Sequence, residues 1–145
     1  MTPSDIPVYR VPPGGSLPDI GAGGGYGVLV TLSLDPTPLS EMSRIANWIV
    51  AQEFGATIHC APDGTIWDDV VDETGLYPPG WDGTDLPDDL ALTSWVSADQ
   101  EGLEDAVSML PTLVAEYGPV MILDIGSAPH PKVIADLVAL LQRPG

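Results

Sequence analysis

The sequence predicts an α+β domain, a two-layer sandwich in which helices cover one face of a β-sheet, preceded by an extended Pro/Gly-rich arm. Two observations support this fold class. Strand-like and helix-like hydrophobic spacings follow one another along residues 28–145. The preceding residues 1–27 are rich in Pro and Gly and show neither spacing. Because 145 residues is a common length for one domain, we expect an arm over 1–27 and a single acidic domain over 28–145.

The arm combines prolines, which are excluded from helix interiors and central strands, with glycines, which raise the entropy cost of ordering the chain. It ends in the glycine-rich run GAGGGYG over 21–27. This run does not match a nucleotide-binding loop, because Tyr26 stands at the third glycine position and the run precedes a strand instead of joining a strand to a helix. We interpret it as a flexible lead into the domain.

The domain is predicted to begin with a strand and a helix. The run YGVLVTLSL over 26–34 is rich in strand-forming residues. Thr37 is a favourable helix cap and Pro38 suits the first helical position. Apolar residues then recur at helical spacing as far as Phe54, and Gly55 supplies a stop signal.

A hairpin is predicted next, formed by ATIHCA over 56–61 and TIWDD over 65–69. Between them stands Pro62-Asp63-Gly64, a turn sequence whose glycine is placed for a positive φ angle. Residues 70–89 are predicted to form a long acidic loop, and unstructured connections of this length are often functional. The run LALTSWVS over 90–97 resumes the alternation of a strand.

The C-terminal part is predicted to form a helix, a strand and a second helix. Ser97 and Gln100 have the spacing of a capping box, and Pro111 is predicted to kink or split the helix that follows. The nearly continuous apolar run PVMILDI over 119–125 predicts a strand buried on both faces. A final helix is predicted over 131–142.

The resulting order is β-α-β-β-(β)-α-β-α. Without the extra hairpin strand and the C-terminal helix, this is the split βαβ arrangement of ferredoxin-like folds. Right-handed crossovers would place both main helices on one face of the sheet. The expected topology is therefore ferredoxin-like, extended by a hairpin strand and a C-terminal helix.

The charge is strongly one-sided, with 21 Asp and Glu against 4 Lys and Arg and a formal net charge of −17. Between Asp63 and Asp105 there are thirteen carboxylates and no Lys or Arg. Direct binding to nucleic acid phosphates or to anionic membranes is disfavoured, because both depend on basic side chains. A basic protein partner or a cation fits the charge, and a second interpretation is that the charge only keeps the protein soluble.

No apolar run approaches the ~20 residues that cross a bilayer, and the N-terminus has no signal-peptide pattern. The single cysteine, Cys60, excludes an internal disulfide. From these features we expect a cytoplasmic protein that does not associate with membranes.

The sequence shows no recognisable catalytic motif. His59 and Cys60 are neighbours on a predicted strand, so they point to opposite faces and are not expected to pair; Cys60 is expected to be an inert core residue. His130 lies between two prolines, where it could cap the last helix or lie on the surface, and a partnership of His59 or His130 with a carboxylate stays open. The Asp clusters do not match the spacing of a calcium-binding EF-hand loop, so neither a metal nor a cofactor is expected.

The most distinctive feature is the mixture of aromatic and acidic residues across 67–95. Aromatic side chains are enriched at binding hot spots, and carboxylates around them would steer a basic partner. An alternative is that these rings close a minor core. The residues expected to bind a partner are Trp67, Tyr77, Trp81, Asp82, Asp85, Asp88 and Asp89.

From these features we expect a non-enzymatic, acidic protein-binding domain, such as an inhibitor or immunity-like factor that masks a basic toxin or nuclease. One alternative is a structural component of a larger assembly, such as a phage particle or secretion apparatus, that uses the 1–27 arm. The other is a small enzyme that uses His59 or His130 with carboxylates.

Overall fold

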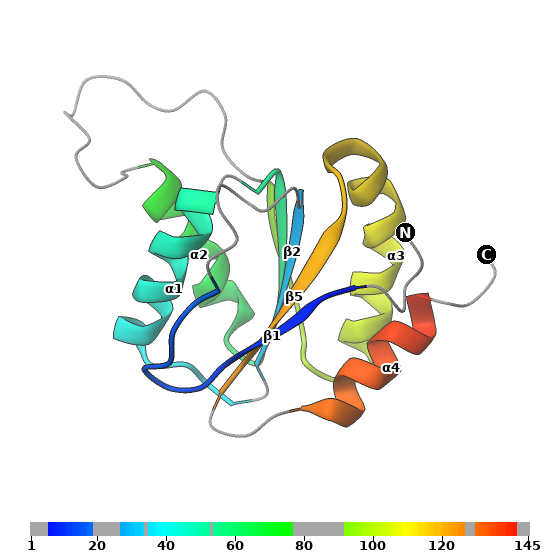
Figure 1. Ribbon diagram of the computed structural model, residues 1–145, viewed down its shortest axis with the longest axis horizontal. Helices are drawn as coiled ribbons and strands as arrows, with labels where there is room; N and C mark the ends of the chain where they lie inside the picture. Colours follow the sequence, from blue (N-terminus) through cyan, green and yellow to red (C-terminus); the bar gives the residue numbers. More distant parts are fainter. Residues whose placement is uncertain are drawn as a thin grey trace.

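The structure is a computed structural model that describes residues 6–18, 27–33, 35–52, 54–76, 92–126 and 130–141. Strands and helices alternate along most of the chain (Figure 1). In order they are β1 (Val8–Val11), β2 (Val28–Leu32), α1 (Leu39–Gln52), β3 (Ala56–Cys60), α2 (Gly64–Leu76), β4 (Leu92–Val96), α3 (Gln100–Tyr117), β5 (Val120–Ile125) and α4 (Pro131–Leu141).

The five described strands form one sheet in the order β1-β5-β2-β3-β4, and every neighbouring pair is parallel. All residues of β2, β3 and β5 are buried. These central strands are covered on both faces, which explains why their sequences are nearly continuous apolar runs instead of alternating ones.

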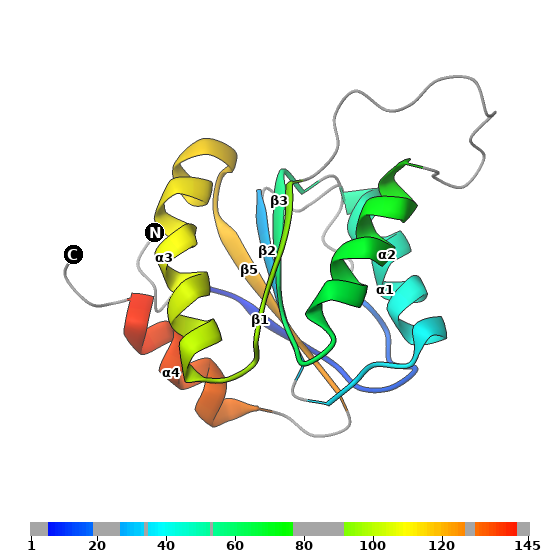
Figure 2. The same cartoon turned by 180° about the vertical axis from the view of Figure 1, so that it is seen from behind.

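Helices cover both faces of the sheet, as the two opposite views show (Figures 1 and 2). On one face, α1 and α2 pack through residues such as Ile45, Ile49 and Trp67. On the other face, α3 and α4 pack through residues such as Leu110 and Leu137. The described domain thus has three layers.

The prediction of a domain with mixed helices and strands is confirmed, whereas the two-layer, ferredoxin-like arrangement is wrong. The described sheet is entirely parallel, and parallel neighbours require a crossover connection. Helices α1 and α2 make two successive crossovers on one face, and α3 returns on the opposite face (Figure 2). A single helical layer cannot contain both sets.

The topological error began with the predicted hairpin. Residues 56–60 do form strand β3, but residues 65–69 lie in helix α2. Asp63 O accepts hydrogen bonds from the Ile66 and Trp67 amides, which starts the helix. Among the α2 side chains that the structure describes, Trp67 and Val71, four residues apart, are buried. Part of the expected acidic loop over 70–89 is also helical, as far as Leu76.

Part of the predicted arm belongs to the sheet. Residues 8–11 form edge strand β1, which pairs with β5 from Val8 opposite Ile122 to Val11 opposite Ile125. As an edge strand paired with β5, this short, Pro-flanked segment satisfies part of its backbone while it stays at the surface of the domain.

The ends of α3 differ in detail from the prediction. Its cap is Asp99, not Ser97: a carboxylate oxygen of Asp99 accepts from the Gly102 amide at 2.9 Å, and Ser97 Oγ donates to that oxygen at 2.7 Å. These hydrogen bonds, the Ser97 one first, lower the pKa of Asp99. Pro111 lies inside the helix, which continues to Tyr117 before Gly118 ends it with φ 119°.

Strand alternation separates Cys60 from His59, as expected. Cys60 belongs to the cluster beneath α3 and α4, and its burial raises the pKa of the thiol to about 12. We expect a disulfide reagent such as DTNB to modify the native protein no faster than the protein unfolds, because the reactive thiolate is suppressed and inaccessible. Labelling rates across a denaturant series measure this, and fast, complete labelling of the native protein would contradict it.

Candidate functional site

The order of strands reverses direction between β2 and β5. From β2 the chain moves outward through β3 to β4, and α3 then carries it back to place β5 on the other side of β2. In open parallel sheets, ligands bind in the crevice beyond the carboxyl ends of the strands at such a switch point. The residues at the ends of β2 and β5 are therefore the first place to look for a site.

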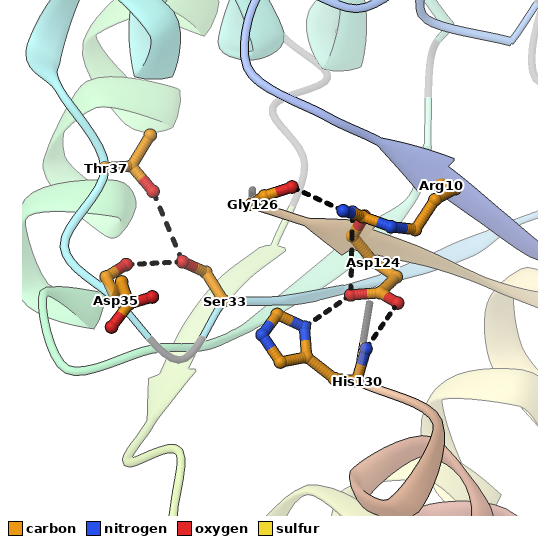
Figure 3. Close-up of polar contacts among 7 residues, drawn as sticks. All are labelled: Arg10, Ser33, Asp35, Thr37, Asp124, Gly126 and His130. Carbon is orange, nitrogen blue, oxygen red and sulfur yellow. Dashed lines mark hydrogen bonds and ion pairs between the residues drawn. The ribbon is translucent and has the colours of Figure 1, made fainter. Parts of the chain in front are cut away.

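Strand β5 supplies a buried carboxylate at this edge. Asp124 Oδ1 lies 2.5 Å from His130 Nδ1, and Asp124 Oδ2 accepts from the His130 backbone amide at 3.0 Å (Figure 3). The side chains of Asp124 and His130 are 3% and 10% exposed. Where the carboxylate is the acceptor of this contact, Nδ1 is the donor and Nε2 is left to accept or donate a proton. This is the orientation that an acid–base histidine needs.

His130 also starts helix α4, since its carbonyl accepts from the Ile134 amide. In Figure 3 its Nε2 points away from Asp124, toward the side of the view where Ser33 and Asp35 lie. Gly126 ends β5 with φ 134°, and a Cβ there would lie 3.6 Å from His130 Cε1. The glycine thus provides a turn that L side chains rarely adopt, close to the imidazole.

Arg10 of β1 contacts the end of β5 around Asp124. Its Nη1 donates to the Asp124 carbonyl at 2.7 Å and its Nη2 donates to the Gly126 carbonyl at 2.5 Å (Figure 3). Nη1 also lies 4.0 Å from Asp124 Oδ1. The guanidinium therefore fixes the end of β5 and offsets part of the cost of a buried carboxylate.

The loop after β2 contributes hydroxyl groups. Buried Ser33 donates through Oγ to the Asp35 carbonyl at 2.7 Å, and this Oγ lies 3.3 Å from Thr37 Oγ1 (Figure 3). The Thr37 amide donates to Asp63 Oδ2 at 2.8 Å, which ties this loop to the turn after β3. Asp63 Oδ1 is buried and has no hydrogen-bond partner among the described residues.

Carboxylates outnumber the guanidinium among the charged groups described at this edge. Asp35, Asp63 and Asp124 carry carboxylates, whereas Arg10 supplies one guanidinium. Within the described ranges, no group of three or more His, Cys, Asp or Glu side chains could hold a metal ion. The edge is equipped for hydrogen bonding and proton exchange.

His59 takes no part in this site. It lies on the α1/α2 face with 0% exposure, stacks on Trp67 at a ring distance of 5.5 Å, and contacts Thr31 Oγ1 at 2.7 Å and Thr57 Oγ1 at 3.1 Å. Burial lowers its pKa to about 3. Of the two histidines considered from sequence, His130 therefore has a carboxylate partner and His59 has two hydroxyl partners.

The residues expected to bind a partner are only partly visible. Trp67 is 0% exposed and packs in the core, which is the alternative that the sequence left open for the aromatic residues. Tyr77, Trp81, Asp82, Asp85, Asp88 and Asp89 lie outside the described residues.

Several site residues were not singled out from sequence. Asp124 falls within the predicted apolar strand over 119–125. A lone acid in a strand buried on both faces needs a partner. That requirement is the sequence signal that marks Asp124 as a candidate site residue. Arg10 was assigned to the arm. By sequence Ser33 falls in the predicted strand over 26–34 and Thr37 is a helix cap, and only the neighbouring ends of β2, β3 and β5 bring them to one edge.

Comparisons of this chain with protein-family models, with curated proteins and with solved structures found no match. None of the helices in the described part of the chain combines the length and the apolar character needed to span a membrane.

Buried His59 predicts a pH-dependent stability. The unfolded chain binds a proton at His59 near pH 6.5, whereas the folded state stays neutral down to its pKa of about 3. Stability contributed by the neutral imidazole is therefore lost as the pH falls, with a slope approaching about 1.4 kcal/mol per pH unit below ~pH 6. Urea unfolding between pH 5 and 7 should show a shallower slope in His59→Gln than in wild type.

His130→Gln is the matched control for the second histidine, and only the His59 variant should lose this slope. Equal slopes in wild type and His59→Gln would mean that His59 is not held neutral by burial.

Proposed function

We propose that the protein binds a small polar ligand at the carboxyl edge between β2 and β5, and that His130 exchanges a proton with it. The observation that supports this most is the Asp124–His130 contact of 2.5 Å at the point where the strand order reverses. A carboxylate that orients an imidazole through Nδ1 leaves Nε2 available to a ligand. This assigns His130 as the acid–base group and Asp124 as its positioning residue.

The charge of the edge favours some ligands over others. Asp35 is exposed and Asp63 has an oxygen without a described partner, whereas the Arg10 guanidinium is occupied by two backbone carbonyls. A phosphate would be repelled by these carboxylates. A ligand with hydroxyl or amino groups would find acceptors in the carboxylates and hydroxyl partners in Ser33 and Thr37.

A ligand screen tests this proposal. Saturation-transfer NMR should detect binding of small polyols or amines. Inorganic phosphate and mononucleotides, the anionic ligands that the carboxylates repel, should not bind at this edge. His130→Ala should weaken a detected ligand at least about tenfold, the usual scale for one hydrogen bond to a charged or strongly polar group. Asp136→Asn, on the exposed side of the same helix, is the control and should change affinity less than twofold. Absence of any polyol or amine binder, or equal affinity in His130→Ala, would refute the proposal.

The positioning role of Asp124 is tested separately. Asp124→Asn keeps the size of the side chain but exchanges an accepting oxygen for a donating amide, so both His130 contacts can be kept only if Nδ1 is unprotonated and the ring proton moves to Nε2. We expect ligand affinity to fall and the free energy of unfolding to fall by about 1–3 kcal/mol. Unchanged ligand affinity in a folded Asp124→Asn protein would show that the carboxylate does not orient the imidazole for binding.

The role expected from composition is a second proposed function: binding of a basic protein, for instance as an inhibitor or immunity-like factor. What favours it is the internal use of the described basic side chains. Arg10 donates to the carbonyls of Asp124 and Gly126, Arg44 pairs with Glu41, and Lys132 pairs with Asp136 at 3.0 Å. The exposed carboxylates are thus left to attract cations from outside.

The proposed role in a larger assembly depends on the N-terminal arm. Because Val8–Val11 pairs with β5 in this structure, that part of the arm is occupied within its own domain. An assembly role would have to use other parts of residues 1–27.

A further inference from the structure

Helix α2 and edge strand β4 meet along a seam fixed at two points. At one end, a Cβ on Gly64 would lie 3.0 Å from Trp95 Cβ and 3.3 Å from Trp95 Cε3, so the indole lies over the first turn of α2. At the other end, Thr93 Oγ1 donates to Asp72 Oδ1 at 2.6 Å. Asp68 is one turn from Gly64 and one turn from Asp72, so it lies between the two contacts. We call these five residues the α2/β4 seam.

The seam presents an aromatic ring to the solvent. Trp95 is 50% exposed. It lies on β4, an edge strand whose only described neighbour is β3. Its side chain packs closely on Gly64, where an added Cβ would force the indole to shift by a few tenths of an ångström. A half-exposed indole is a surface on which a cation can stack.

The seam also carries a carboxylate that lacks a donor. Asp68 Oδ1 is buried and has no hydrogen-bond partner among the described residues. A buried acceptor without a donor is unfavourable, and an N–H group that reached it would remove that penalty. Asp72 beside it already accepts from Thr93, so Asp68 is the carboxylate of the seam that lacks a donor, and a partner's N–H group has to displace the atoms that cover Oδ1 to reach it.

No described cation of the chain supplies that donor. Arg10 lies on β1 at the opposite edge of the sheet, Arg44 pairs with Glu41 on α1, and Lys132 pairs with Asp136 on α4. Further carboxylates, Asp69 and Glu73, are exposed on the outer side of α2. The field at the seam is therefore negative, and a positively charged group from outside would be drawn to it.

We propose that the α2/β4 seam receives an Arg or Lys side chain of a basic partner protein, which stacks on Trp95 and donates to Asp68. An Arg guanidinium suits both contacts, because it is planar and has several donors in one plane. The proposal rests on the basic-partner function and names its surface, and it is independent of the ligand site at His130. It also relocates the aromatic anchor from buried Trp67 to exposed Trp95.

A blocked hexa-arginine peptide serves as the probe, titrated into the full-length protein labelled with ¹⁵N. The Trp95 indole signal, assigned from its loss in Trp95→Leu, should shift during the titration while the amides of α3 stay in place. Trp95→Leu and Asp68→Asn should each weaken binding at least about fivefold. Glu101→Gln, which neutralises an exposed carboxylate on α3, is the matched control and should change affinity less than twofold.

The outcomes separate the two levels of the proposal. If the peptide does not bind at all, both the basic-partner function and the seam are refuted. If it binds, but Glu101→Gln weakens it as much as Trp95→Leu does, binding is a general charge effect and the seam is refuted. Should Asp68→Asn lower the melting temperature, the wild-type titration decides: a Trp95 indole signal that does not move refutes the seam.

Discussion

A buried carboxylate near the end of an apolar strand organises the carboxyl edge of this domain. Asp124 belongs to β5, every residue of which is buried, and an unpartnered charge at that place would be strongly destabilising. Its neighbours meet that cost from two directions: Arg10 approaches from β1, and His130 approaches from the start of α4. The carboxylate therefore joins three elements that are far apart in sequence: β5, the edge strand β1 and the start of the last helix.

The parallel sheet determines where such polar groups can be placed. Its central strands are buried on both faces, so buried polar side chains there need partners within the layer, as His59 has in Thr31 and Thr57. The groups of the proposed ligand site lie at the strand ends, where the chain leaves β2 and β5 for opposite helical layers. The seam between α2 and β4 is a different kind of surface, on the side of an edge strand, and the two proposed sites do not share residues.

Much of the secondary structure could be predicted from sequence, because its signals are local. The strand at 28–32 and the helix that ends at Gln52 have clear periodicity, and the apolar run around β5 predicted a strand covered on both faces. The errors arose where a short stretch fits two periods. Ile66 and Trp67 among acidic residues were assigned to a strand, although they belong to α2, and this one assignment changed a parallel crossover into a hairpin.

The site was less predictable, because it is assembled by topology. His130 was recognised as a candidate, but its partner Asp124 comes from a strand whose place beside β1 and β2 no local pattern reveals. Arg10 lies 114 residues from Asp124 in sequence. Trp67 and Trp95 look equivalent by sequence, and only the packing of α2 makes the first a core residue and the second a half-exposed one.

The most direct test of this account is the protonation of the His130 ring, measured by long-range ¹H–¹⁵N correlation spectroscopy of the neutral imidazole. If Asp124 holds the ring as described, the proton resides on Nδ1, with a downfield signal from its hydrogen bond to the carboxylate, and this preference is lost in Asp124→Asn. A wild-type His130 protonated on Nε2 would contradict the account, because Nδ1 would then have no proton to donate to Asp124.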